Sequence, residues 1–469
     1  MNHFNMDKFN FKHMEQSLFI LLSEIFVEQF EEILKQLDEQ IMEQRDKNRY
    51  RLKDQRPLTI QTLFGEVTIE RRMYIDRQTG QTQYLLDQYL SIEGNKTISP
   101  NLEDWAIRLA VEGTSYRKAA NLLKEWFGKP VLSHETIRQK LIERGIQNQK
   151  EEAEQHPLPQ EEDTKQKNKP KPKVLFIEVD GIFTSIQGSR SKENRIAMVY
   201  TGWEKDGNRF IEKDRHYYKH EGKEDFWTQF GEFILKHYEV DEQTWWIVNG
   251  DGADWIKECE NHFRNVIYVI DRYHLAKAIK DNLGKDPSTY EKIREAFLNY
   301  DGEKIIQIIT EKEAPTSSAK KQKEWVQFVT YMKNNAKYHR DYRTILQKHG
   351  LDTSEYRPMG GSEAMMRFFA RRIKSGGVSL SLPGIDAMIR MIISLKTTRK
   401  ILGEKKVVDL GKLVEQTQKQ LTQTGGGVKR VIRKITDYGK GVINGKARYM
   451  ETTSRNHPMH RALRDLQGI

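Results

Sequence analysis

Apolar residues recur with two different periods along this chain, and the changes of period divide it into segments. Residues 14–46 carry leucines, isoleucines and phenylalanines at steps of three and four with acids between them, which predicts one long amphipathic helix. Its apolar stripe must be buried, either on its own chain or against a second copy. From Pro57 to Asp87 the period is two, which predicts a three-stranded meander. Arg71 and Arg72 are expected on its outward face, solvated or in contact with phosphate.

The segment 99–147 returns to helical periodicity with one break. A first helix runs from Ser115 to Trp126, and a second runs from an N-cap at Ser133 to a terminating Gly145. The pattern predicts a helix-turn-helix, in which the second helix presents its first residues to a DNA major groove. Helix pairs with glycine between them also occur without DNA binding. The candidate DNA contacts here are Arg117, Lys118, His134, Thr136, Arg138, Gln139 and Lys140.

The next segment, residues 149–173, has no apolar period and is rich in proline and charge. Such a stretch cannot bury a core, so it predicts a linker between two separate bodies.

Buried strands that each end in an acid dominate residues 173–274. Val174–Asp180 is the first, two more follow with a hairpin signal at Asp206-Gly207, and an amphipathic helix comes next. Two further strands lead to Asp251 and Asp271. Three strands, a helix, a strand, a helix and a strand, with acids in these places, is the order of a ribonuclease-H-like fold.

Two of these acids predict a metal site. An ionised Asp180 among apolar neighbours needs a compensating positive charge, and neighbouring strands would bring Asp251 beside it. Two crowded carboxylates require a divalent cation between them. The alternative is that each Asp-Gly is an ordinary turn. Glu178, two residues earlier on the same face of the strand, is expected to assist or substitute.

After Asp271 about eighty residues read as helix only. This predicted insertion ends at the turn Gly360-Gly361, where Ser362 caps a new helix and Glu363 lies in its first turn. Glu363 is thus a candidate third metal ligand, and Glu355 is the alternative candidate. Glu363 could also be an ordinary glutamate at the start of a helix, without a ligand role. Three basic residues share one stripe of this helix and are candidate contacts to a nucleic-acid backbone: Arg367, Arg371 and Lys374.

Composition narrows the choice of partner and compartment. The net charge of +11 favours a polyanionic partner, although a ribosome-associated or merely well-solvated protein would also fit. The single cysteine, Cys259, excludes an intramolecular disulfide and a thiolate cluster, so a reducing cytosol is expected. No signal peptide is recognisable, and the longest apolar run, Leu18 to Leu22, is too short to cross a membrane, so no membrane partner is expected.

Short motifs spread over nearly the whole chain resemble those of the ISLre-type bacterial insertion-sequence transposases, which are related to the Mutator-like group of DDE transposases. The motifs are Leu63-Phe-Gly-Glu-Val67, Tyr84-Leu-Leu-Asp87, Ser115-Tyr-Arg-Lys-Ala-Ala120, Glu178-Val-Asp-Gly181, Gly250-Asp-Gly-Ala-Asp-Trp-Ile256, Asp271-Arg-Tyr-His274 and Gly360-Gly-Ser-Glu363.

The resemblance implies a catalytic and metal-binding triad of Asp180, Asp251 and Glu363, with Asp271 and His274 as organisers of the site. It implies Mg²⁺-dependent cleavage and strand transfer, with Mn²⁺ as a substitute. The implied partners are double-stranded DNA, as terminal inverted repeats and target, and a second copy in the DNA complex. The protein is expected in the bacterial cytoplasm, associated with the nucleoid. A DNA-binding regulator without catalysis and a nuclease that cuts without joining are the alternatives.

The expected fold class is therefore α/β: a ribonuclease-H-like domain with an all-helical insertion, preceded by a β meander and a helix-turn-helix. The expected boundaries are 1–50 for the N-terminal helix, 51–98 for the meander, 99–148 for the helix-turn-helix, 149–173 for the linker, 174–400 for the catalytic domain with its insertion at about 275–356, and 401–469 for a basic C-terminal region in contact with phosphate or solvated.

Overall fold

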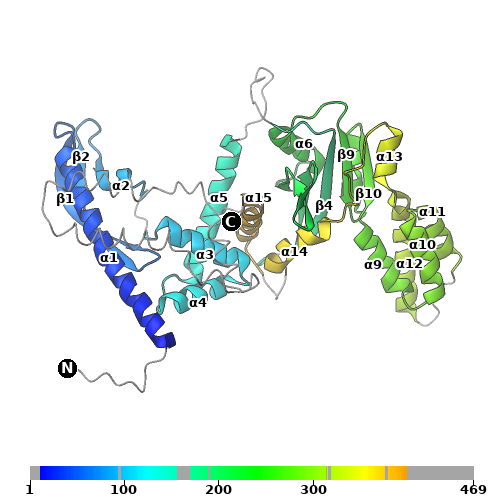
Figure 1. Cartoon of the computed structure of the whole chain (residues 1–469), viewed down its shortest axis with the longest axis horizontal. Helices are drawn as coiled ribbons and strands as arrows, with labels where there is room; N and C mark the ends of the chain where they lie inside the picture. The colour runs from blue at the N-terminus through cyan, green and yellow to red at the C-terminus, as the bar shows by residue number, and fades with distance from the viewer. Residues whose placement is uncertain are drawn as a thin grey trace. The chain divides into compact units, whose positions relative to one another are not determined.

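A computed structural model describes residues 11–92, 97–155, 169–188, 191–312, 314, 318–374 and 379–398 (Figure 1). Most of the expected linker and the expected C-terminal region, 401–469, lie outside the described residues. Within the described residues the protein is of the mixed α/β class, which is the class that the sequence predicts. None of the described helices is long and apolar enough to cross a membrane.

The N-terminal part is a long helix lying along a small sheet. Helix α1 (Phe11–Gln44) is followed by strands β1 (Tyr50–Gln61), β2 (Glu66–Asp76) and β3 (Thr82–Tyr84), which pair antiparallel in that order. The long helix and the meander are confirmed. The second half of α1 packs on the sheet and forms a core of Leu34, Leu58, Ile60, Val67, Ile69 and Leu86. The first half leaves Leu18, Leu22 and Ile25 exposed.

Two details of this sheet differ from expectation. The third strand stops at Tyr84, and Leu85–Tyr89 forms a short helix, α2. Arg71 and Arg72 are not on a solvated face, because α2 and α1 bring carboxylates to them. Arg71 is buried in an ion pair with Asp87, and Arg72 Nη1 lies 2.6 Å from Asp38 Oδ2. These arginines therefore tie the helices to the sheet and do not face phosphate.

Three helices follow: α3 (Pro100–Glu112), α4 (Tyr116–Phe127) and α5 (His134–Gln155). The predicted N-caps are confirmed, since Ser115 Oγ accepts from the amide of Lys118 at 3.1 Å and Ser133 Oγ accepts from that of Thr136 at 3.0 Å. Helix α4 ends at Gly128, whose left-handed φ of 70° is typical of a glycine that follows a helix.

Gly145 does not terminate α5, which continues to Gln155 and so extends into the expected linker. A Cβ placed on Gly145 would lie 2.6 Å from Cβ of Ala387 in helix α15 (Leu382–Thr398). The glycine is therefore used for close helix packing. Because α5 packs along α15, and Arg390 of α15 pairs with Glu152 and Glu221, the two expected bodies are not separate at this place.

The central sheet has the strand order β10-β9-β4-β5-β8. Strands β4 (Val174–Thr184), β5 (Lys192–Tyr200) and β8 (His216–Lys219) pair antiparallel, whereas β9 (Trp245–Gly250) and β10 (Val266–Ile270) run parallel to β4. The hairpin expected at Asp206-Gly207 is present as a separate two-stranded ribbon, β6 (Gly202–Asp206) and β7 (Arg209–Lys213). The expected third strand is thereby divided into β7 and β8.

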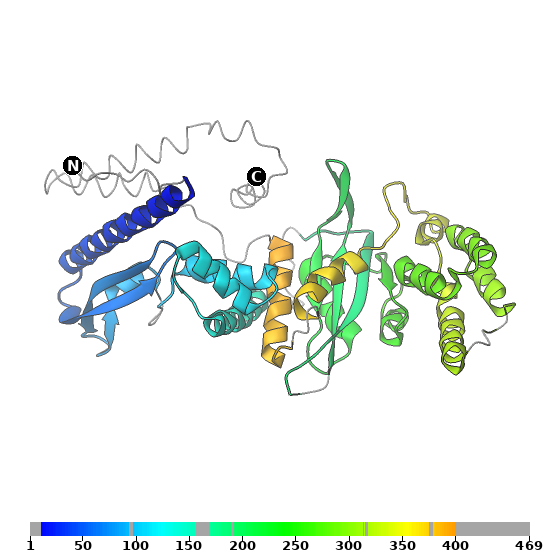
Figure 2. The ribbon, with the colours of Figure 1, turned by 90° about the horizontal axis from the view of Figure 1, so that it is seen from below.

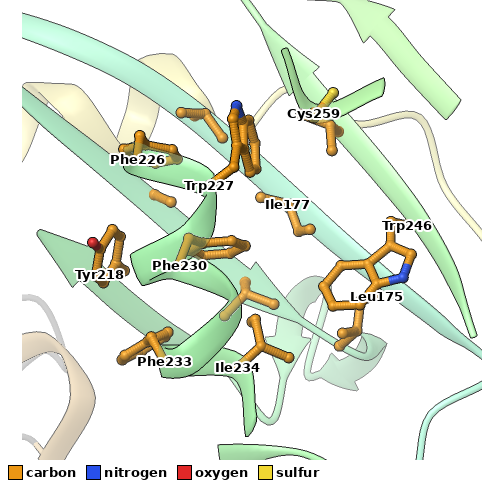
Figure 3. Close-up of a cluster of buried hydrophobic side chains, with 14 of the residues drawn as sticks. Leu175, Ile177, Tyr218, Phe226, Trp227, Phe230, Phe233, Ile234, Trp246 and Cys259 are labelled. Carbon is orange, nitrogen blue, oxygen red and sulfur yellow. The ribbon is translucent and has the colours of Figure 1, made fainter. Parts of the chain in front are cut away.

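One face of this sheet is covered by helix α6 (Phe226–His237), with the short helices α7 (Asp254–Lys257) and α8 (Cys259–His262) nearby. The amphipathic pattern of α6 correctly predicted its buried side. Figure 3 shows Phe230 and Ile234 of α6 on the side of Ile177 and Leu175 of β4, with Phe226 and Phe233 on the side of Tyr218 of β8. The labelled side chains are Leu175, Ile177, Tyr218, Phe226, Trp227, Phe230, Phe233, Ile234, Trp246 and Cys259. This tightly packed core holds β4 and β9 in register, which matters for the acids at their ends.

Between β10 and α14 (Ser362–Ile373) the described residues contain helices and no strand, as predicted. These are α9 (Arg272–Leu283), α10 (Pro287–Leu298), α11 (Gly302–Thr310), α12 (Ala319–Asn335), the 3₁₀ turn η2 (Ala336–Tyr338) and α13 (Tyr342–Lys348). Most of them pack around a core of their own that includes Ile279, Ile293, Ile305, Phe328 and Met332, and Figure 2 shows them as a separate bundle next to the sheet.

Candidate active site

Two carboxylates lie just beyond the last paired residues of the parallel strands β4 and β9. Glu178 of β4 is paired with Asn249 of β9. Two residues further on are Asp180, which is still within β4, and Asp251, which directly follows the end of β9. Because the two strands run parallel, this register places both aspartates beyond the same end of their pairing. This is the arrangement that the sequence predicts for them.

Asp180 is buried and poorly compensated. It is 8% exposed, and its carboxylate accepts a hydrogen bond from the amide of the next residue, Gly181, at 2.7 Å. Burial, and then the negative charge of Asp251, raise its pKa to about 6, while the nearby His274 acts in the opposite direction. Among the described residues, no lysine or arginine forms an ion pair with Asp180. Such a carboxylate is an attractive ligand for a cation.

Asp251 is held in a turn by the helical insertion. Its Oδ1 accepts from the amide of Ala253 at 3.0 Å, and its carbonyl oxygen accepts from the hydroxyl of Tyr331 in α12 at 3.2 Å. Gly252 has a φ of 101°, and a Cβ there would lie 2.6 Å from Oδ1 of Asn335. Helix α12 thus packs directly against the Asp251 turn, a link between insertion and site that the sequence does not reveal.

Asp271 and His274, the predicted organisers, form one hydrogen-bonded unit with Ser362. His274 Nδ1 lies 2.9 Å from Asp271 Oδ2, and the same oxygen accepts from Ser362 Oγ at 2.6 Å. Burial would raise the pKa of Asp271, but these donors outweigh it and hold the pKa below its usual value. The hydrogen bond to Asp271 raises the pKa of His274, and the charges of Asp180 and Asp251 add to this. Asp271, Asp180 and Asp251 therefore all favour the protonated form of His274.

Glu178 has a different environment from the one expected for an auxiliary ligand. Its side chain, 1% exposed, accepts hydrogen bonds from Tyr200 Oη at 3.0 Å and Asn249 Nδ2 at 3.2 Å. The backbone amides of Gly360, Gly361 and Ser362 donate to it at 3.3, 2.9 and 2.6 Å. Burial raises its pKa, and these donors oppose the rise. Glu178 therefore fastens the N-terminus of α14 to β4, so its oxygens are not available as spare ligands.

Glu363 lies in the first turn of α14, as predicted, immediately after Ser362. Its carboxylate points to Arg367, with Oε1 3.3 Å from Nε, and the side chain is 32% exposed. Within the described part of the chain, no three histidine, cysteine or acidic side chains are grouped closely enough to hold a metal ion. The structure thus brings Asp180 and Asp251 together but does not add the Glu363 carboxylate to them. The rival Glu355 is exposed in the loop before α14.

Two of the predicted ligands have the chemistry that the implied metal requires. Asp180 and Asp251 supply oxygen ligands of the type that Mg²⁺ prefers, and the uncompensated burial of Asp180 fits a site built for a cation. Glu363 follows a serine that contacts both Glu178 and Asp271, but its own carboxylate pairs with Arg367.

The predicted DNA contacts on α4 and α5 are at the protein surface, but several have acidic partners. Arg138 Nη2 lies 2.6 Å from Glu135, and Lys140 Nζ lies 2.8 Å from Glu143. Gln139 also bonds Glu135, and the Thr136 hydroxyl bonds that of Ser133. Arg117, Lys118 and His134 are exposed. Their positions do not test DNA binding, so these contacts stay predictions.

Helix α14 carries the other predicted contacts and an unexpected buried arginine. Arg367, Arg371 and Lys374 are exposed, whereas Arg372 is buried. Arg372 Nε donates to the carbonyl oxygen of Ala110 at 2.7 Å, and its guanidinium lies 4.9 Å from the ring centre of Tyr116. The helical period does mark this residue, because it follows the buried Met365 and Phe369 at steps of four and three.

Fold and site together define a mixed α/β protein with a buried, partly uncompensated carboxylate cluster at the edge of a sheet. The chain belongs to the family UPF0236, described as an uncharacterised protein family, whose model matches residues 5–407.

Relatives of similar length carry the same family name. A UPF0236 protein of Caldanaerobacter subterraneus subsp. tengcongensis is 24% identical over 444 residues, which cover 93% of this chain and 87% of the relative. Another from the same organism is 25% identical over 94% of this chain and 88% of its own, and its name joins eleven locus designations. The UPF0236 protein in the vanSb 3′ region of Streptococcus gallolyticus is 25% identical over 80% of this chain and 81% of its own.

Proposed function

We propose that this protein is a DDE transposase of the ISLre type, which binds the ends of its insertion sequence and catalyses DNA cleavage and strand transfer. The observation that carries the proposal is the pair Asp180 and Asp251, which the register of β4 and β9 places side by side, with Asp180 buried and, among the described residues, without an ion pair to lysine or arginine. A buried acid beside a second acid costs stability and is best explained by chemistry.

The sheet supports a ribonuclease-H-like interpretation. Three antiparallel strands are followed by two that run parallel to the first, and the first strand, β4, lies in the middle of the sheet. A helical segment between β10 and α14 corresponds to the insertion that the resemblance implies. The fold class alone does not determine function, so the argument depends on the acids.

In the proposed mechanism Asp180, Asp251 and Glu363 would hold Mg²⁺. The metal, when bound, would activate the attacking oxygen and neutralise the leaving oxygen of a phosphodiester. Glu178 holds the first turn of α14 against β4, and Glu363 would have to leave its ion pair with Arg367 to act as a ligand. Asp271 orients His274, and His274 opposes the rise in the pKa of Asp180 that burial and Asp251 cause.

Helices α4 and α5 are proposed to bind the element ends as a helix-turn-helix. Binding of DNA would compete with Glu135 for Arg138, and with Glu143 for Lys140, because phosphate oxygens accept the same hydrogen bonds. Arg367, Arg371 and Lys374 would contact the DNA backbone beside the triad.

The names of the relatives also support the proposal that the gene belongs to a mobile genetic element. A protein name that joins eleven locus designations of one organism describes a gene present in many copies, which is what a mobile element produces. That the gene of this chain also belongs to a mobile element is part of the proposal.

The test is a reaction of the full chain with labelled DNA carrying the element ends and a target plasmid, with Mg²⁺ or with chelator. We expect a joined product that needs Mg²⁺ and is abolished by Asp180→Asn, with DNA binding retained in a gel-shift assay. Asp281→Asn, an exposed aspartate on α9, is the matched control and should join DNA normally. Cleavage without joining would instead indicate a nuclease.

The ion pair between Glu363 and Arg367 favours one other candidate, a DNA-binding regulator without catalysis. In that case the wild-type protein would bind the ends but give neither cleaved nor joined product at any Mg²⁺ concentration.

A further inference from the structure

The first half of α1 carries a second apolar stripe, distinct from the one that packs on the sheet. Phe11, Met14, Leu18, Leu21 and Ile25 follow one another at alternating steps of three and four, and we call them the α1 seam. Each is between 46% and 80% exposed. An apolar repeat of alternating three and four is the spacing of a coiled-coil contact line.

The seam lies on the far side of the helix from the sheet contact. At 100° per residue, the seam residues cluster around the direction of Leu18, whereas Phe30, Leu34, Leu37 and Ile41 cluster roughly 120–150° away. The latter pack on β1 and β2 or beside them. Because the helix is already committed to the sheet by that side, the seam cannot turn inward without undoing an existing core.

The two ends of the seam differ in charge. Lys12 lies next to its start, and Glu28 and Glu32 occupy the next two positions of the repeat after Ile25. In a parallel pair of identical helices, Glu28 would face Glu28 and Glu32 would face Glu32. In an antiparallel pair Leu18 faces Leu21, Met14 faces Ile25, and Glu28 meets Phe11 and Lys12 near the positive end of the partner helix. The antiparallel arrangement removes the repulsion and adds favourable contacts.

We propose that a second copy of this chain covers the seam, its α1 packing antiparallel on the first, and that the protein is therefore a dimer in the absence of DNA. The α1 helix of a second copy matches the seam, because it has the same apolar repeat and, when antiparallel, a complementary order of charges. The inference stands apart from the proposed function, since it concerns the free protein. If both hold, one dimer presents two α4–α5 pairs to the two ends of an element.

The experiment measures the mass of the full chain by light scattering and by sedimentation over a concentration series without DNA. The wild type is expected at twice the 55.3 kDa chain mass. Leu21→Glu places a charge in the seam and should raise the dimer dissociation constant at least about tenfold. Ile20→Glu is the matched control: Ile20 is 50% exposed and Leu21 51%, but Ile20 points to the opposite side of the helix. It should leave the mass unchanged.

Orientation is tested by cross-linking at single cysteines. A mixture of copies carrying Leu18→Cys and Leu21→Cys should form more intermolecular disulfide than either variant alone, since the antiparallel pair places these positions face to face. The native Cys259 is buried and does not compete.

A wild type that stays monomeric at all concentrations overturns the proposal, and would mean that another part of the same chain covers the seam. Equal weakening by Ile20→Glu and Leu21→Glu also overturns it, because the dimer would then not use this face. Circular dichroism of both variants verifies that α1 still folds. Failure of the DNA-joining assay with an intact dimer would count against the proposed function alone.

Discussion

Two carboxylates on one strand have opposite environments in this protein. Glu178 and Asp180 are two residues apart on β4 and point to the same face of the sheet. Glu178 is surrounded by hydrogen-bond donors from β5, β9 and the start of α14. Asp180 has one backbone donor and a second acid nearby. A buried carboxylate supplied with donors holds a structure together, whereas one left without them is kept for a ligand.

The largest effect on stability is expected from a substitution of Glu178, the carboxylate that is surrounded by donors. Glu178→Gln replaces an acceptor by an amide whose NH₂ group would face donors, and leaves buried N–H groups without a partner. We expect a loss of about 3–4 kcal/mol in the free energy of unfolding. Chemical denaturation measures it, with Glu204→Gln on the exposed strand β6 as the control. Equal stability of the two variants would contradict the role of Glu178 as the fastening of α14.

A substitution of Asp180 is expected to change stability in the opposite direction. Its folded pKa of about 6 lies above the usual 3.8, so its contribution to stability is fully present below pH 3.8 and is lost as the pH rises through 6. At pH 7 the ionised side chain therefore costs about 3 kcal/mol in the absence of a cation. Asp180→Asn should be more stable than wild type at pH 7 by up to that amount, with DNA joining abolished. Denaturation at pH 4.5 and 7 measures the difference, which should shrink at the lower pH; a destabilised Asp180→Asn would refute it.

A smaller effect separates two neighbouring arginines at the other end of α14. Arg372→Met removes the buried donor to the carbonyl of Ala110 and should cost about 2 kcal/mol of unfolding free energy. Arg371→Met is the matched control, because Arg371 is exposed; it should alter stability by less than about 0.5 kcal/mol. DNA affinity should show the reverse order, falling in Arg371→Met. Equal effects on stability would show that the Ala110 contact does not hold α14.

The smallest effect is expected at Ser362, which joins the two carboxylate environments. Ser362→Ala removes the hydrogen bond to Asp271 but keeps the backbone amide that Glu178 uses, so a loss of about 1 kcal/mol is expected. The pKa of Asp271 should rise, because one of its donors is gone. An NMR titration of the Asp271 carboxyl and a denaturation curve measure the two changes. A loss as large as that of Glu178→Gln would mean that the hydroxyl, and not the amide, fastens α14.

Local pattern was sufficient for a large part of this fold. The three- and four-residue steps predicted α1, the caps Ser115 and Ser133 predicted where α4 and α5 begin, and apolar runs ending in acids predicted β4, β9 and β10. These features are readable because each depends on a few neighbouring residues. The adjacency of Asp180 and Asp251 was predictable from strand order, since parallel neighbours end at the same edge.

Other residues were misread where the partner is distant in sequence. Gly145 appeared to end a helix, but it makes room for Ala387, and Arg71 appeared to face solvent, but α2 brings Asp87 over it. The difference between Glu178 and Asp180 is of the same kind, because the donors around Glu178 come from residues 200, 249 and 360–362.

The sequence by itself therefore determined the elements, their order and the candidate acids. The tertiary structure alone decided which of those acids are supplied with hydrogen bonds, which helix Arg372 fastens, and which side of α1 remains uncovered. The physical reason is that periodicity and capping are local properties of the backbone, whereas burial and the satisfaction of a charge depend on groups brought together only when the chain folds.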